Sequence, residues 1–81
     1  MELSKVDETV TQLLGEVLQM PTTQITDELT MSEVETWDSL THMEFIAMLE
    51  TSINTPLTFE EIVAMKNVRA IKQILRAKLA N

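Results

Sequence analysis

An acid and a serine stand side by side near the middle of this 81-residue chain, and its only histidine follows three residues later. They are Asp38, Ser39 and His42, within the stretch VETWDSLTHMEF. Positions three apart share one face of a helix, so Ser39 and His42 could act as a nucleophile and its general base. Two other interpretations compete. Asp38 could cap a helix, or the Ser39 hydroxyl could be the attachment point for a covalent group.

Other kinds of chemistry lack the residues they need. The chain has no cysteine for a thiolate zinc site and only one glycine, too few for a phosphate-binding loop. Residues 27–38 are rich in acids, but Leu29 and Met31 occupy positions where a calcium loop needs oxygen ligands. A Ser/His hydrolase also needs an oxyanion hole and a third, orienting group, and the sequence indicates neither. We therefore expect His42 to be solvated or in contact with a partner.

The charges are unevenly distributed along the chain. All 13 acids lie within residues 1–65, where Lys5 is the only cation, and the net charge is −7. An acidic body repels nucleic acid and attracts basic protein surfaces, so no nucleic-acid partner is expected. The basic residues at the end of the chain complement a helix dipole and offset the acids. They are Lys66, Arg69, Lys72, Arg76 and Lys78.

Apolar periodicity predicts the elements that would hold these residues. Spacings of three and four predict helices over residues 4–18, 39–53 and 67–80, and Thr58 can cap a short helical turn within 57–65. The connection 19–37 carries isolated apolar residues that can pack it down, among them Trp37. With a single glycine and little β-branched alternation, strands are not expected. The prediction is one all-α domain, residues 1–81: a small bundle of three main helices and one short helix with a long first loop.

The N-terminus is acidic and amphipathic, unlike a signal peptide, and no apolar run approaches the roughly 20 residues of a membrane span. We therefore expect a cytoplasmic, soluble monomer with no membrane partner.

In this context, Asp-Ser-Leu at the start of the second helix resembles the acyl carrier proteins. The resemblance extends over nearly the whole chain, through LLGEVL, WDSL, MEFIAMLE and FEEI followed by NVRAIKQIL. It implies that a phosphopantetheinyl transferase attaches 4′-phosphopantetheine to Ser39, and that acyl groups are held as thioesters on the terminal thiol of that arm. The chain would then be a carrier and not an enzyme, and its sulfur would arrive with the cofactor.

The resemblance also assigns roles to the surrounding residues. Asp38 would aid recognition by the transferase in addition to capping the helix. Contact with partner enzymes is expected at Leu40, Met43, Glu44 and Ala47, with Glu33, Glu35 and Glu50 as further acids for steering. An acyl cleft, or simply the core, is expected at Phe45, Ile46, Leu49, Ile62 and Met65. The bulk of Phe45 and Ile62 suggests a small cleft and therefore short or polar acyl groups.

The flanking residues bear on the pathway. Carriers of fatty acid synthesis often have an acid two positions after the serine, where this chain has Thr41. A tryptophan directly before Asp-Ser-Leu, as Trp37 is here, looks more like the stand-alone carriers of polyketide and other secondary-metabolite pathways. Partners would then be acyl-loading, condensing (ketosynthase) and acyl-processing enzymes. Fatty acid synthesis, a discrete aminoacyl or peptidyl carrier, and an unmodified helical adaptor remain alternatives.

Overall fold

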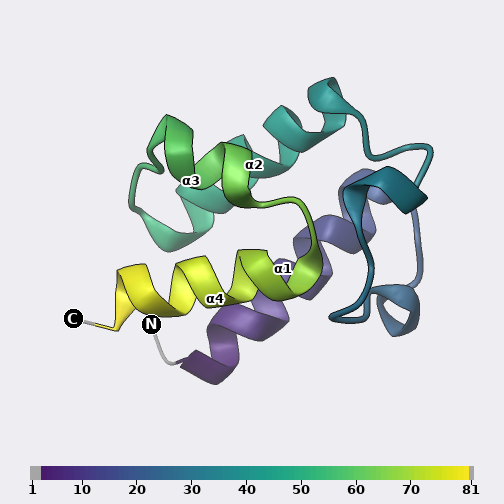
Figure 1. Ribbon diagram of the computed structural model, residues 1–81. Helices are drawn as coiled ribbons and strands as arrows, with labels where there is room; N and C mark the ends of the chain where they lie inside the picture. The colour runs from purple at the N-terminus through teal and green to yellow at the C-terminus, as the bar shows by residue number, and fades with distance from the viewer. Residues whose placement is uncertain (1–2, 81) are drawn as a thin grey trace.

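The computed structural model describes residues 3–80, and within that range the chain forms four α-helices and no β-strand. The helices are α1 (Leu3–Leu18), α2 (Ser39–Ile53), α3 (Phe59–Ala64) and α4 (Val68–Leu79), as drawn in Figure 1. Two single-turn 3-10 helices, η1 (Thr22–Gln24) and η2 (Met31–Glu33), lie in the connection between α1 and α2. The predicted all-α bundle with a long first loop is confirmed. None of the helices within residues 3–80 is long and apolar enough to cross a membrane.

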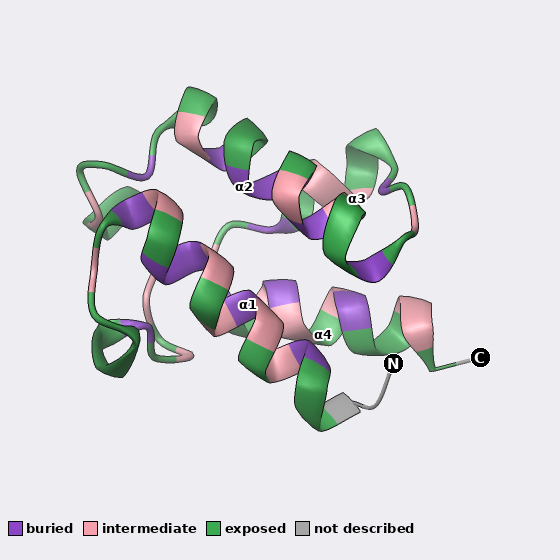
Figure 2. Ribbon diagram, turned by 180° about the vertical axis from the view of Figure 1, so that it is seen from behind, coloured by how far each residue is buried: buried purple, intermediate pink, exposed green. Residues whose placement is uncertain are grey.

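The core lies between α1, α2 and α4. Each of these helices turns a stripe of buried side chains inward, and α3 contributes none (Figure 2). On α1 the stripe follows the four-residue spacing of a helix face, which is why the sequence pattern predicted it correctly. The helical core residues are Val6, Val10, Leu14, Leu18, Phe45, Ile46, Leu49, Ile53, Val68, Ile71 and Leu75.

Helix α1 ends in a turn that depends on its glycine. Gln19 adopts a left-handed conformation with φ 57°, and the Met20 N–H donates to the Gly15 carbonyl at 3.0 Å. This is the hydrogen bond of a Schellman cap. A Cβ on Gly15 would lie only 3.0 Å from the Met20 carbonyl oxygen. Gly15 therefore lets the chain fold back across the helix, which accounts for a glycine at a position where alanine would favour the helix more.

The first loop is packed down, as its apolar residues predicted. Trp37 and Ile25 are buried, and the loop forms backbone hydrogen bonds with the start of α4. The Met31 N–H donates to the Lys66 carbonyl at 2.8 Å, and the Val68 N–H donates to the Leu29 carbonyl at 3.0 Å. These bonds place residues 30–32 beside residues 65–67.

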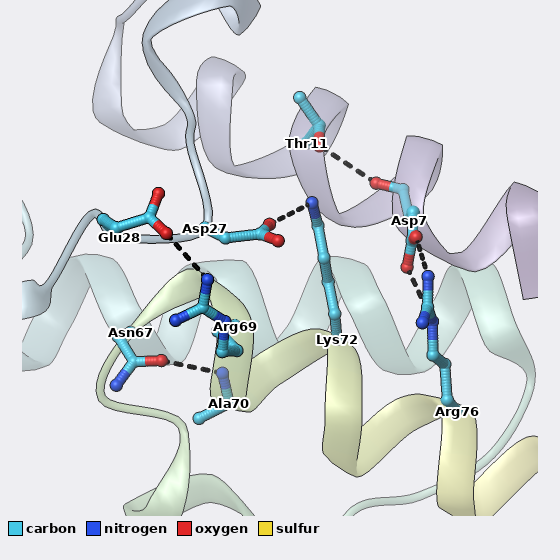
Figure 3. Close-up of polar contacts among 9 residues, drawn as sticks. All are labelled: Asp7, Thr11, Asp27, Glu28, Asn67, Arg69, Ala70, Lys72 and Arg76. Carbon is cyan, nitrogen blue, oxygen red and sulfur yellow. Dashed lines mark hydrogen bonds and ion pairs between the residues drawn. The ribbon is translucent and has the colours of Figure 1, made fainter.

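The cations of α4 are paired with acids elsewhere in the chain (Figure 3). Lys72 contacts Asp27 at 2.7 Å, and its hydrogen bond holds the pKa of the Asp27 carboxyl below the ordinary value. Four acids outside α4 thereby offset four cations on it, in line with the predicted role of the basic segment. The pairs are Lys72–Asp27, Arg69–Glu28, Arg76–Asp7 and Lys78–Glu61.

Candidate functional site

Asp38 and Ser39 begin α2. Asp38 is extended (φ −98°, ψ −177°), and its carboxylate accepts the Thr41 N–H at 2.9 Å. The hydrogen bonds from Thr41, its backbone first and then its side chain, hold the pKa of the Asp38 carboxyl below its ordinary value. Asp38 therefore caps the helix and stays ionised. Ser39 is the first helical residue, and it is exposed.

His42 does not lie where the sequence suggested. It is buried, with 7% of its surface exposed, so the expectation of a solvated or partner-contacting histidine is wrong. The indole N–H of Trp37 donates to its Nδ1 at 3.0 Å, and its Nε2 lies 3.1 Å from the Ile62 carbonyl oxygen. Trp37 arrives from the loop and α3 covers the other side, so a face of α2 that is polar in sequence becomes interior.

These contacts also decide the question of a Ser39/His42 dyad. A general base needs a free ring nitrogen within reach of the serine hydroxyl. Both nitrogens of His42 are hydrogen-bonded, one to Trp37 and one to Ile62. In this arrangement His42 connects the loop, α2 and α3, and neither of its ring nitrogens is free to act on Ser39.

An apolar groove of about 640 Å³ runs beside Ser39. Its walls come from α2, from α3 and from the two segments that the loop brings together. Because polar groups are few along most of it, the groove suits a flexible apolar or amphipathic chain better than a compact charged ligand. It is lined by Thr30, Met31, Ser32, Ser39, His42, Met43, Phe59, Ile62, Val63, Met65, Lys66 and Asn67.

Comparison with known families identifies this arrangement. The family model described as the phosphopantetheine attachment site matches residues 8–75, which includes α2, α3 and the groove. The chain belongs to this family. A comparison with curated proteins gave no significant match. The resemblance to phosphopantetheine-binding carriers is thereby confirmed. Domains of this family carry 4′-phosphopantetheine covalently on a serine and are generally non-catalytic carriers.

The start of α2 fits such a group. A phosphodiester at the first residue of a helix lies near the free N–H groups and the positive end of the helix dipole. The exposed hydroxyl of Ser39 leaves space for a substituent, and the adjoining groove offers apolar walls. In this attachment domain the cofactor supplies the terminal thiol, which a chain without cysteine cannot provide.

The five residues predicted for an acyl cleft divide into two groups. Phe45, Ile46 and Leu49 are fully buried in the core and do not line the groove. Ile62 and Met65 line the groove, and Ile62 is only partly buried. The core of this attachment domain is therefore filled at the first three positions, while the last two face the space beside Ser39.

The residues predicted to meet partners are exposed on α2. Leu40 is 72% and Met43 50% exposed, and Glu44 and Ala47 are exposed with them. The sequence interpretation missed two further apolar side chains on α3. Phe59 and Val63 are 75% and 47% exposed. Their spacing of four residues, offset from Ile62, was the signal that could have revealed a second apolar face on this short helix.

Two of the predicted steering acids have other partners within the chain. The Glu50 carboxylate accepts the Leu57 N–H at 2.7 Å, and the Glu33 carboxylate accepts the Thr30 hydroxyl at 2.9 Å. The first hydrogen bond holds α2 to the segment before α3, and the second belongs to the cap of η2. Glu35 and Glu44 are exposed, so they are the better candidates for contact with a basic partner.

Proposed function

We propose that Ser39 carries the phosphopantetheine arm, and that the domain presents acyl groups, held as thioesters on the arm, to partner enzymes. The observation that carries the proposal is the exposed Ser39 hydroxyl at the first residue of α2, within the matched family region. The domain's own side chains would hold and orient the arm, and the reactions would take place in the partners.

The other serines support Ser39 by contrast. Ser4 lies outside the matched residues, and Ser52 stands near the C-terminal, negative end of α2. Ser32 lies in a 3-10 turn, with its hydroxyl 3.2 Å from the Thr30 hydroxyl. Among them only Ser39 combines a place in the family region with the N-terminus of an α-helix, where a phosphate is favoured.

Attachment of the arm would depend on a transferase for its chemistry. The His42 ring is occupied on both nitrogens, and the Asp38 carboxylate accepts the Thr41 N–H. His42 therefore provides no base beside Ser39, and we propose that the transferase supplies the group that accepts the hydroxyl proton. Asp38, held as a carboxylate at the exposed helix start, would aid recognition by that enzyme.

We further propose that partner enzymes contact the exposed apolar residues that flank Ser39, with Glu44 adding electrostatic steering. Leu40, Met43 and Ala47 supply the contact from α2, and Phe59 and Val63 extend it onto α3. A surface that combines a few large apolar side chains with one or two acids suits brief, reversible docking.

For the pathway, we propose polyketide or related secondary-metabolite synthesis with short or polar acyl groups. Two features support this. The helix start carries Thr41 where a fatty acid carrier often has an acid, and the bulky Phe45 ring fills the core. Loading with a long fatty acyl group and finding it buried in the core would contradict the assignment of short cargo.

The attachment itself is tested by mass spectrometry of the intact protein. Incubation with coenzyme A and a broad-specificity phosphopantetheinyl transferase should add one phosphopantetheine per chain. Ser39→Ala should abolish the addition, and the matched variants Ser32→Ala and Ser52→Ala should retain it. A wild-type chain that stays unmodified, or a Ser39→Ala chain that is modified, would overturn the proposal. Intact mass of the protein from its native host would then identify the acyl group.

A further inference from the structure

We infer that Trp37 and His42 are positioning residues: Trp37 fixes the orientation of the neutral His42 ring, and His42 holds α3 against α2 and so shapes the groove beside Ser39. The inference rests on the proposed function for its meaning, because the groove matters as the space beside the attached arm. The contacts that it concerns exist in the unmodified chain, so they can be tested without the arm.

The two partners of His42 fix the protonation of its ring. An indole N–H can only donate a hydrogen bond, and a backbone carbonyl can only accept one. Nδ1 must therefore present its lone pair to Trp37, and Nε2 must carry the proton that it donates to the Ile62 carbonyl. This arrangement is possible for the neutral ring in a single tautomer.

Helix α3 depends on such contacts because it has no buried residue of its own. Three side-chain hydrogen bonds connect it and its entry to the other helices within residues 3–80. Glu50 binds the backbone just before α3, and Lys78 of α4 binds Glu61. The His42 bond is the one among these that joins α3 itself to α2, and both His42 and Ile62 line the groove.

Protonation of the ring would break its bond to Trp37 at Nδ1 and leave the Nε2–H that faces Ile62 in place. A proton on Nδ1 would face the Trp37 N–H, and two donors repel. The charged groups near the ring offer no compensation: Lys66 lines the same groove, Asp38 is bound to Thr41, and Glu61 is paired with Lys78. Glu60 of α3 is exposed, and no hydrogen bond joins a carboxylate to either ring nitrogen within the described chain. The aromatic rings of Trp37 and Phe45, with centroids 6.1 and 6.3 Å away, complete its surroundings.

The consequence concerns the shape of the groove. While Trp37 orients His42, the imidazole holds the Ile62 end of α3 and fixes the wall that Ile62 and Met65 form beside Ser39. Once the ring is charged, Nε2 can still donate to the Ile62 carbonyl, but the Trp37 N–H no longer fixes the orientation of the ring. The α3 wall of the groove would then be positioned less firmly.

The first test is the tautomer of His42, read from the ring nitrogen signals by NMR at alkaline pH. We expect the wild type to show Nε2–H alone. Trp37→Phe, which keeps an aromatic ring but removes the donor, should show a mixture of tautomers. A mixture in the wild type, or an unchanged single tautomer in Trp37→Phe, would overturn the assignment.

The second test is hydrogen exchange of the α3 backbone. His42→Ala should raise the exchange rate of the Ile62 and Met65 amides by about tenfold, the value of one lost hydrogen bond. The Ile71 amide in α4 serves as the internal reference and should change less. His42→Gln keeps an acceptor and a donor on one side chain, so it should restore slow exchange in α3. Equal acceleration in α3 and α4 would mean that His42 supports global stability only.

The third test is a pH titration, which shows whether Trp37 and α3 respond when the His42 ring gains a proton. The chain has one tryptophan and one histidine, so the fluorescence of Trp37 and the imidazole signals each report a single residue. In the wild type, Trp37 fluorescence and the methyl signals of Ile62 and Met65 should change with the midpoint of the imidazole. In His42→Gln they should stay flat over that range. Titration of the ring without these changes would contradict the inference.

The same variants separate this inference from the proposed function. His42→Ala and His42→Gln leave the Ser39 hydroxyl in place, so both should still accept phosphopantetheine by intact mass. If the wild type accepted none, the proposed function would fail while the tautomer, exchange and fluorescence results stood. If loading succeeded and those three results failed, the positioning role alone would be lost.

Discussion

The two sides of the bundle are held together by different means. Between α1 and α4, buried Val6, Val10, Ile71 and Leu75 form a continuous core, and Asp7 and Asp27 bind cations of α4 across its outer edge. Around α3, no helical residue is buried, and large apolar side chains face outward. That helix is held by capping residues and a few hydrogen bonds from its neighbours.

The contrast shows how so small a domain can combine a fixed scaffold with an adaptable site. Local opening requires the least free energy where few apolar contacts are lost, so α3 should open more readily than α1 or α4. The groove beside Ser39 is bounded by that less firmly held helix. Stability and site shape are therefore governed by different residues, and each can be altered separately.

The largest expected effect tests this contrast with two phenylalanines. Phe45→Ala removes a fully buried ring from the core and should lower the free energy of unfolding by about 3–5 kcal/mol. Phe59→Ala removes a ring that is 75% exposed and should change it by less than about 0.5 kcal/mol. Urea unfolding followed by circular dichroism measures both. Comparable losses in the two variants would show that α3 is packed more firmly than its exposure suggests.

A smaller effect is expected at the start of α4. The Asn67 side chain caps that helix by accepting the Ala70 N–H at 2.7 Å. Asn67→Ala should cost about 1 kcal/mol of stability, and Asn67→Asp, which keeps an acceptor in place, should lose much less. Thermal or chemical unfolding of the pair distinguishes them. Equal losses would mean that the position matters through packing and not through its cap.

A gain in stability is expected at the end of α1. The left-handed conformation of Gln19 costs free energy because the residue has a Cβ, so Gln19→Gly should stabilise the domain by up to about 1 kcal/mol. Gly15→Ala should not stabilise it, although alanine is the better helix former, because the new Cβ would press on the Met20 carbonyl. Unfolding midpoints of both variants provide the measurement. A gain in Gly15→Ala would show that the turn after α1 can shift at little cost.

The smallest effect concerns the ion pairs at the outer edge of α4, read as a dependence on pH. The Lys72 hydrogen bond lowers the pKa of Asp27 in the folded chain. The ionised Asp27 therefore contributes its full share of stability above its pKa in the unfolded chain, about 4, and loses it as pH falls through its pKa in the folded chain. Asp27→Asn should therefore lose less stability than the wild type between about pH 5 and pH 2. Glu28→Gln is the control, since the Glu28–Arg69 pair is more exposed and contributes less. A wild-type and an Asp27→Asn chain with the same acid dependence would contradict this account.

Much of the fold could be predicted because it follows from local periodicity. The predicted helix 39–53 agrees with α2, and the cap at Asp38 agrees with its hydrogen bond to Thr41. The site was harder to predict where contacts come from distant residues. Whether His42 is buried depends on Trp37 folding back from the loop and on Ile62, 20 residues further on, and neither is expressed in the helical spacing of α2.

The exposed apolar residues of α3 illustrate the opposite error. In a helix of six residues, an apolar side chain is usually assigned to the core. The four-residue spacing of Phe59 and Val63 indicates that they share a face, but not that this face is exposed. Glu50 holds the segment before α3 at Leu57, and Lys78 binds Glu61 within the helix, so contacts with distant residues set its rotation. Only the packed chain contains that information.

The position of Ser39 has a consequence for the encounter between cargo and partner. As the first residue of a 15-residue helix capped by Asp38, its backbone is fixed to the bundle. Under the proposed function, an arm attached there would pivot about a stationary root, and its length alone would set the volume that the thioester explores. Once a partner has docked, the local concentration of the acyl group at the partner's active site would be in the millimolar range typical of short flexible tethers, independent of how much carrier the cell contains.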